Sequence, residues 1–191
     1  MPANVRSDPS AAQPKCRYRC SGPGNAPLDG DRRADVAVVG GGFTGLSAAL
    51  YLAGIGADVM RLEAHEPGWG ASGRNGGQVN PGLKHDPDRV EADFGPDLDR
   101  RMVALSGNAP DFVFNLIRQH QISCAALQSG TLRSAISRKG SVEVRASAEQ
   151  WIRRTIAVSV LERDEIVSVT GTDRYQAAML DRRGGQLNPL S

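Results

Sequence analysis

The stretch that most constrains the fold of this chain is residues 34–63. A short apolar run at residues 36–39, mostly of β-branched residues, predicts a buried parallel strand. A glycine-rich turn follows at once, and we expect a helix over residues 44–53 and a second strand over residues 58–62. This order of strand, turn, helix and strand predicts a βαβ unit, in which two parallel strands flank a crossover helix.

The turn contains glycine at the three positions of the pattern GxGxxG, namely Gly40, Gly42 and Gly45. In this pattern the first glycine makes the tight turn, the second lets a pyrophosphate approach the backbone, and the third lets the helix lie close to the strand. The start of the helix then offers free N–H groups and the positive end of its dipole to the phosphates. Glu63 ends the second strand roughly 20 residues further on, where dinucleotide-binding folds keep an acceptor for ribose hydroxyls.

Two other interpretations of this stretch are open. It could be a glycine-rich turn in an unrelated α/β unit, or a membrane span, because residues 36–57 carry no charge and are numerous enough to cross a bilayer. Consecutive glycines oppose a continuous helix, since each costs about 1 kcal/mol relative to alanine. Basic residues lie near both ends of the run, so they encode no orientation in a membrane. We therefore predict no membrane span.

Charge is distributed unevenly along the 191 residues, whose net charge is +2. Residues 1–33 carry six basic and three acidic side chains, a net +3, so the rest of the chain has a net charge of −1. The absence of a basic excess outside this segment argues against a nucleic-acid-binding surface. Residues 1–33 are also rich in proline and glycine and poor in aliphatic residues, which predicts a disordered leader.

The cysteines and histidines suggest neither a disulfide framework nor a metal site. Cys16, Cys20 and Cys124 are too few for a framework, and the three histidines show no ligand spacing with them. The first residues contain no apolar segment of the kind found in secretory signal peptides. We expect free thiols in a cytoplasmic protein.

A long glycine-rich segment, residues 64–83, follows Glu63. Loops of this length inside a compact domain are usually functional, although a plain surface loop is the alternative. Small residues at 70–73 allow backbone N–H groups to converge on an oxygen-rich ligand, and Arg74 and Asn75 add further donors. A plain loop would need neither this many glycines nor a side chain as large as Trp69.

Gly40–Gly45, Glu63 and the sequence GASGRNGGQ at residues 70–78 together resemble the FAD-dependent oxidoreductases of the D-amino-acid oxidase and glycine oxidase family. Within that family, GASGRNGGQ is most similar to the gamma-glutamylputrescine oxidoreductase group. Weaker similarity continues through residues 173–175 and 181–190, so the resemblance covers residues 34 to the end.

The resemblance implies a set of FAD-binding positions. The turn would hold the pyrophosphate, Glu63 the adenosine ribose, Ala71 and Ser72 the phosphate and ribityl region, and residues 74–78 would pass near the flavin ring. The implied positions are Gly40, Gly42, Phe43, Thr44, Gly45, Glu63, Ala71, Ser72, Arg74, Asn75, Gly76, Gly77 and Gln78.

The resemblance also implies the chemistry. The flavin in that family accepts a hydride from the carbon beside the nitrogen of a small amine or amino acid, and the protein supplies orientation and electrostatic field. No nucleophile–base arrangement is visible in the spacing of His and Cys, so the sequence gives no support to hydrolase chemistry. We name no general base, and the catalytic residues are left open. A catalytically inactive dinucleotide-binding remnant or interaction module is the alternative function. An NAD-linked dehydrogenase is a third, but it does not account for the glycine-rich segment after Glu63.

From residue 86 the sequence pattern becomes mainly helical. Asp86 is a suitable N-cap, with Pro87 at the first helical position, and Gly95 with Pro96 should break the helix. Pro110 should end or kink the next one. Its core-facing residues are expected at helical spacing, at Leu98, Met102, Leu105, Phe112, Val113, Leu116 and Ile117. Further helices are expected at residues 147–158 and 163–169, and strands at residues 122–127, 130–136, 177–180 and 186–187.

These expectations combine into an α/β fold, in which a Rossmann-like FAD-binding βαβ unit is followed by the first part of an α+β substrate domain. The predicted domains are a leader (1–33), the N-terminal part of an FAD-binding domain (34–84), a partial substrate domain (85–185) and a truncated return to the FAD-binding domain (186–191). Because two strands cannot bury both faces of a parallel sheet, we expect an incomplete fold that is a fragment of a longer protein. The oligomeric state is left open.

Overall fold

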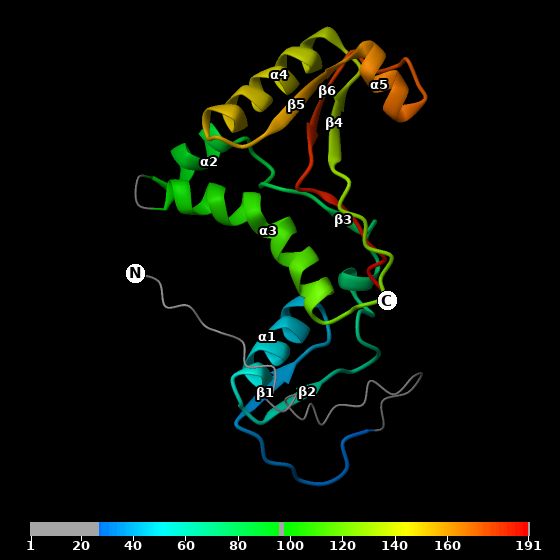
Figure 1. Cartoon of the computed structure of the whole chain (residues 1–191). Helices are drawn as coiled ribbons and strands as arrows, with labels where there is room; N and C mark the ends of the chain where they lie inside the picture. Colours follow the sequence, from blue (N-terminus) through cyan, green and yellow to red (C-terminus); the bar gives the residue numbers. More distant parts are fainter. Residues whose placement is uncertain (1–26, 96–97, 191) are drawn as a thin grey trace. The chain divides into compact units, whose positions relative to one another are not determined.

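The computed structural model describes residues 27–95 and 98–190, and the described chain divides into two compact units (Figure 1). The first unit runs to Asn75 and also includes Leu190, and the second comprises residues 76–189. Most of the predicted leader, residues 1–26, lies outside the described residues, and residues 27–34 contain no helix or strand. The domain limits at residues 84 and 185 stay predictions.

The first unit contains the predicted βαβ arrangement. Strands β1 (Val36–Val39) and β2 (Val59–Leu62) are parallel, and helix α1 (Phe43–Gly54) connects them. The 3-10 turn η1 (Ala71–Gly73) lies in the glycine-rich segment that follows. The burial expected for β1 is wrong, because the side chain of Val39 is 85% exposed and α1 has no fully buried residue. Among the described residues β1 and β2 pair only with each other, so each strand has one edge without a neighbouring strand.

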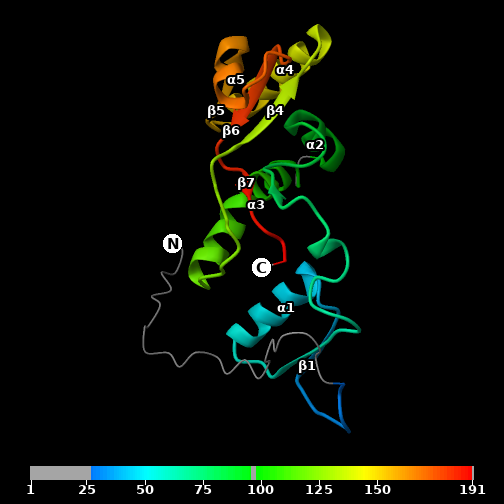
Figure 2. The same cartoon turned by 90° about the vertical axis from the view of Figure 1, so that its right-hand side faces the viewer.

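The second unit is built on an antiparallel sheet of order β4-β6-β5, with α4 along one face (Figures 1 and 2). Its strands are β4 (Thr131–Ala135), β5 (Val158–Glu162) and β6 (Ala177–Asp181). Its helices are α2 (Pro87–Phe94), α3 (Asp99–Gln119), α4 (Arg138–Arg153) and α5 (Arg163–Thr170). The short strands β3 (Gln78–Val79) and β7 (Gly185–Gln186) form a separate antiparallel pair.

Successive residues of β6 contribute to two different apolar clusters, as expected when side chains alternate across a strand. Met179 belongs to a cluster with Val144, Ala148 and Trp151 of α4. Ala178 belongs to a second cluster, in which Ile166 of α5 is fully buried. The central strand of the sheet is therefore covered by α4 on one side and by α5 on the other.

Helix α3 continues through Pro110, so of the two predicted outcomes, an end or a kink at this residue, the end is wrong. A proline in a helix interior cannot donate to the carbonyl four residues earlier, which here belongs to Ser106. The Ser106 carbonyl instead accepts a hydrogen bond from the backbone N–H of Gly82 at 2.9 Å. The preceding loop therefore satisfies the acceptor that the proline leaves open.

The buried face of α3 differs from the predicted one. Its buried residues are Val103, Gly107, Pro110 and Phe114, whereas Leu105 and Phe112 are 71% and 53% exposed. Apolar periodicity placed the stripe wrongly because two of the buried positions are glycine and proline. Glycine and proline are buried at these positions because neighbouring segments pack closely against them, and not because they carry large apolar side chains.

Two segments between these elements also depart from expectation. Residues 122–127 form no strand, since Leu127 alone pairs with Gln186 and Ala125 has a positive φ of 48°. The helix expected at residues 147–158 is α4, which begins nine residues earlier, where the Ser137 hydroxyl accepts from the N–H of Gly140 at 3.1 Å. It ends at Arg153, before Thr155 with its φ of 61°, and the segment from Val158 forms β5 instead.

A buried ion pair connects the turn after β6 to the helices. Asp181 accepts two hydrogen bonds from the Arg183 side chain, at 3.0 Å from Nε and 2.6 Å from Nη2. The Arg183 guanidinium lies 4.7 Å from the centre of the Trp151 ring. A Cβ on Gly107 of α3 would be 2.8 Å from Arg183 Nη1, so the absence of a side chain there makes room for the stack.

Among the described residues, no helix combines the length and apolar character that spanning a bilayer requires. In the same residues, no group of three His, Cys, Asp or Glu side chains is placed to hold a metal ion. Cys124 is a buried free thiol, while Cys16 and Cys20 lie outside the described residues.

The packing of α5 on the sheet leads to a stability prediction. We expect Ile166→Ala to lower the free energy of unfolding by about 2–5 kcal/mol, because it removes fully buried methyl groups and leaves a cavity. Ile136→Ala, at a side chain that is 70% exposed, should change it by no more than about 0.5 kcal/mol. Urea unfolding of the two variants provides the comparison, and equal losses would contradict the packing described for α5.

Candidate functional site

The glycine turn of the first unit is shaped by two backbone constraints. Gly40 has a φ of 112°, a conformation that favours glycine, and its N–H donates to the Leu62 carbonyl at 2.7 Å. A Cβ on Gly45 would lie 2.2 Å from the Gly40 carbonyl oxygen, a distance that no side chain can occupy. The turn is thereby bonded to the end of β2, and the first turn of α1 lies directly against it.

The start of α1 has backbone donors without acceptors. Phe43 N–H donates to the Ser72 hydroxyl at 3.0 Å, whereas the N–H groups of Gly42, Thr44 and Gly45 have no acceptor within the part of the chain that the structure describes. Free N–H groups at the positive end of a helix dipole are suited to an anion. No side chain fills the space beside Gly40, where a Cβ would meet nothing within 4 Å. The residues present therefore fit a diphosphate group at this helix end.

Glu63 is held at the edge of the same turn by backbone hydrogen bonds. One carboxylate oxygen accepts from the His65 N–H at 3.0 Å, and the other accepts from the Gly41 N–H at 2.5 Å. These bonds, first that of His65 and then that of Gly41, lower the pKa of Glu63 below its ordinary value of 4.5. Since a carboxylate has about four lone-pair positions, both oxygens keep the capacity to accept from hydroxyl groups of a sugar.

The glycine-rich segment is attached to the turn through its backbone and one hydroxyl. The Gly68 N–H donates to the Gly41 carbonyl at 2.9 Å, and Ser72 accepts from the first helical amide as described above. Asn75 donates from its side-chain amide to the carbonyls of Ala71 at 3.2 Å and Ser72 at 2.7 Å. The first unit thus gathers the predicted positions from Gly40 to Asn75 around η1 and the start of α1.

A stack of side chains in this segment was not predicted. The rings of His65 and Trp69 are nearly parallel, with centroids 4.9 Å apart, and the Arg74 guanidinium lies 4.7 Å from the centre of the Trp69 ring. The sequence signalled only that a large aromatic residue sits among glycines. Arg74, predicted to pass near a flavin, is placed by this stack.

The last three predicted positions belong to the second unit. Gly77 has a φ of 67°, and its carbonyl accepts from the Leu187 N–H at 2.9 Å. Gln78 pairs with Gln186 in the β3–β7 ladder, and Gly76 is exposed. The backbones of Gly77 and Gln78 join β3 to the β7 segment, and the contact of all three positions with a flavin ring stays a prediction.

A parallel βαβ unit with this turn and an acid after its second strand defines the class of dinucleotide-binding folds. Residues 35–191 match the family described as FAD dependent oxidoreductase. The chain is therefore a member of the FAD-dependent oxidoreductase family, as the resemblance predicted.

The relatives agree with this assignment. The chain is 38% identical over 158 residues to gamma-glutamylputrescine oxidoreductase of Escherichia coli (strain K12), covering 82% of this chain and 37% of the relative. It is 34% identical over 167 residues to the probable oxidoreductase OrdL of Rhizobium meliloti (strain 1021), covering 85% of this chain and 38% of the relative. Among solved structures, glycine oxidase from Geobacillus kaustophilus has the same fold, with a TM-score of 0.66 at 20% identity over 83% of this chain and 42% of the oxidase chain.

The lowered pKa of Glu63 predicts a pH-dependent contribution to stability. A carboxylate with a depressed folded-state pKa stabilises the fold fully above its unfolded value, near 4.5, and loses that effect as the pH falls through the lower folded value. The difference in unfolding free energy between the wild type and Glu63→Gln should therefore be constant above that pH and shrink below it. Urea unfolding across a pH series measures this difference.

Glu66→Gln provides the matched control for this series. Glu66 is exposed in the same segment, and its carboxylate accepts no hydrogen bond among the described residues. Its substitution should produce a smaller difference that lacks the decline seen with Glu63→Gln. If the two substitutions gave the same profile, the hydrogen bonds of Glu63 would not be the source of its effect.

Proposed function

We propose that this chain binds FAD at the start of α1 and forms the FAD-binding and adjoining part of an oxidoreductase that acts on the CH–NH bond of a small amine or amino acid. The observation that carries the proposal is the set of three backbone N–H groups, at Gly42, Thr44 and Gly45, that lack acceptors in the described structure beside the anchored carboxylate of Glu63. Family membership supports FAD as the dinucleotide.

The substrate class is proposed from the relatives. One relative is named for gamma-glutamylputrescine, an amine, and a structural neighbour is named for glycine. The chain spans 37% and 38% of the length of the two curated relatives described above, so the activity of the whole protein is part of the proposal. A cytoplasmic location stays a prediction from the sequence.

Each part of the proposed site has a physical role. The open amides at the start of α1 would donate to pyrophosphate oxygens, and Glu63 would accept from the ribose hydroxyls. Ala71 and Ser72 would border the phosphate and ribityl region, while residues 74–78 would lie near the flavin ring. When bound, FAD supplies the two-electron oxidation, and the protein supplies binding, orientation and electrostatics.

The cofactor assignment predicts the behaviour of one glycine substitution. A Cβ on Gly42 would lie 3.0 Å from the Ser72 hydroxyl, at the place where the diphosphate must approach the backbone. We expect Gly42→Ala to weaken FAD binding about tenfold or more, which corresponds to about 1.4 kcal/mol. Gly54→Ala, at the other end of the same helix with nothing within 4 Å of its Cβ, should leave binding unchanged.

Flavin fluorescence during titration of the purified chain measures FAD binding, and NAD serves as the competing dinucleotide. Saturable binding of FAD that NAD does not displace supports the proposal. Preference for NAD would favour a nicotinamide-linked dehydrogenase instead. Circular dichroism of both glycine variants shows that any loss of binding is not a loss of folding.

The substrate class is tested on the FAD-loaded chain. We expect the visible absorbance of bound flavin to fall when gamma-glutamylputrescine or glycine is added without oxygen, because the substrate passes two electrons to the cofactor. A matched carboxylic acid without the amine, acetate in place of glycine, should produce no change. Flavin that binds but is never reduced by amines would identify the chain as a catalytically silent binding module.

A further inference from the structure

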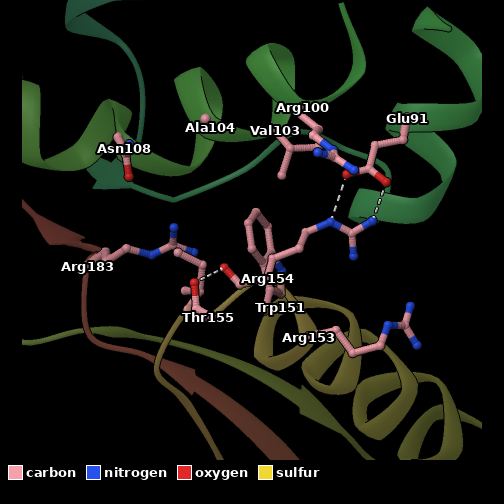
Figure 3. Close-up of a pocket in the computed structure, with 11 residues that line it drawn as sticks. Glu91, Arg100, Val103, Ala104, Asn108, Trp151, Arg153, Arg154, Thr155 and Arg183 are labelled. Atoms are coloured by element: carbon pink, nitrogen blue, oxygen red, sulfur yellow. Dashed lines mark hydrogen bonds and ion pairs between the residues drawn. The ribbon is translucent and has the colours of Figure 1, made fainter. Parts of the chain in front are cut away.

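We infer that the second unit carries a binding site for a small organic anion with an apolar body, in a cavity bordered by α2, α3 and the end of α4. Figure 3 shows the cavity with side chains from these helices and from the turn after β6 converging on it. Its volume is about 530 Å³, within the range of about 300–1,000 Å³ that is usual for small-molecule sites. All lining residues belong to the second unit.

Arginine dominates the charged lining of this cavity. Four arginines line it, together with a single carboxylate, that of Glu91. The lining arginines are Arg100, Arg153, Arg154 and Arg183. A ligand that enters this space therefore meets mainly positive charge. The charge that the ligand should carry depends on how many of these arginines are already paired with carboxylates.

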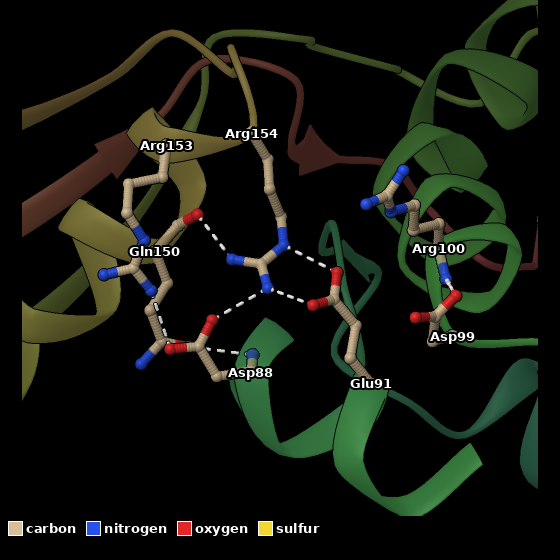
Figure 4. A network of polar contacts seen from close by, with 7 residues as sticks. All are labelled: Asp88, Glu91, Asp99, Arg100, Gln150, Arg153 and Arg154. Carbon is tan, nitrogen blue, oxygen red and sulfur yellow. Dashed lines mark hydrogen bonds and ion pairs between the residues drawn. The ribbon is translucent and has the colours of Figure 1, made fainter. Parts of the chain in front are cut away.

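Three of the four guanidinium groups have carboxylate partners. Arg154 pairs with Glu91 at 2.5 Å and with Asp88 at 2.7 Å (Figure 4). The hydrogen bonding of its guanidinium to the Glu91 carboxylate is the main cause that raises the pKa of Arg154. Arg153 shares Asp88 at 2.7 Å. Arg183 is held by Asp181, which lies outside the lining.

Arg100 is the remaining cation. It lies at the start of α3, it is exposed, and its guanidinium makes no ion pair with a carboxylate of the described residues. The adjacent Asp99 carboxylate accepts from the backbone N–H of Arg100 rather than from its side chain (Figure 4). The other three lining arginines are paired with carboxylates, so Arg100 is the lining cation that has no carboxylate partner in the described part of the chain. The complementary ligand therefore carries one negative charge.

The rest of the lining is suited to an apolar group with few polar contacts. Val103, Ala104, Ile156 and the ring of Trp151 supply the apolar wall, and Asn108 adds an amide that can donate or accept. Thr155, also in the lining, has a φ of 61°, a conformation that β-branched residues rarely adopt. Backbone outliers of this kind cluster at ligand sites. A monocarboxylate with an aliphatic chain combines the charge and the apolar body that this lining accepts.

Trp151 makes the site directly measurable. The chain contains two tryptophans, and Trp69→Phe leaves Trp151, which lines the cavity, as the only tryptophan. We expect hexanoate to change the fluorescence of this variant saturably, and hexan-1-ol, which has the same chain without the charge, to bind at least tenfold more weakly. The full 191-residue chain is used throughout.

Arg100→Gln in the same background should weaken hexanoate binding at least tenfold, because it removes the cation that has no carboxylate partner. Since Arg100 is exposed, we expect the substitution to leave folding unchanged. Arg163→Gln is the matched control, since Arg163 is exposed on α5, does not line the cavity and makes a 3.5 Å surface pair with Asp173. It should leave hexanoate binding unchanged. Circular dichroism of both variants confirms that they are folded.

The inference is overturned by any of three results. These are no saturable response to hexanoate, equal binding of hexanoate and hexan-1-ol, or equal binding by the Arg100→Gln and Arg163→Gln variants. None of these outcomes bears on FAD binding, which is measured on residues of the first unit. Success or failure here is therefore independent of the proposed function.

Discussion

The candidate site depends on the close approach of Gly45 to the carbonyl oxygen of Gly40. A Cβ at position 45 would stand 2.2 Å from that oxygen, so glycine is required for the first turn of α1 to meet the end of the glycine turn. This contact places the open amides of the helix beside the end of β2, where Glu63 is anchored. Without it, the helix would stand away from the strand, and the open amides would no longer lie beside the Glu63 carboxylate.

The glycine-rich segment strengthens this arrangement from outside the βαβ unit. Its Gly68 N–H bonds to the Gly41 carbonyl and its Ser72 hydroxyl accepts from the Phe43 N–H, so residues nearly 30 positions apart are joined at one turn. Ser72 satisfies a single helical amide and leaves others open. The segment therefore acts as a partial cap that fixes the helix end while keeping it available to an anion.

The local sequence pattern was sufficient to predict the strands and the helix of the first unit. It was insufficient to predict the buried face of α3 and strand β5 in the second unit. The strand, turn and helix around Gly40 follow from residue types that are adjacent in sequence, and they were predicted to within a residue. The burial of Gly107 and Pro110 could not be predicted, because a hydrophobic pattern does not register residues that are buried for close backbone contact. Strand β5 was missed because it follows α4 after a short turn and its apolar residues continue the helical spacing.

The two candidate sites show the same contrast between features that follow from local sequence and features that arise from tertiary packing. The glycines and Glu63 were predicted from their spacing, while the stack of His65, Trp69 and Arg74 arises from a loop path that no periodicity describes. The arginine-lined cavity joins residues from α2, α3, the end of α4 and the turn after β6, and the outermost of them, Glu91 and Arg183, are 92 positions apart. Tertiary packing alone brings these charges together.

The proline within α3 has a consequence for how this part of the chain can vary. Because Pro110 has no N–H to donate to the Ser106 carbonyl, that oxygen is free to accept from the Gly82 N–H. Gly82 has a φ of 86°, and a Cβ on it would lie 3.0 Å from the Trp151 ring, so there is little space for a side chain at this position. An ordinary residue at position 110 would introduce a rival donor, and a larger residue at position 82 would push the loop off the indole. The two positions are thus thermodynamically linked across 28 residues, and tolerated substitutions at one should depend on the identity of the other.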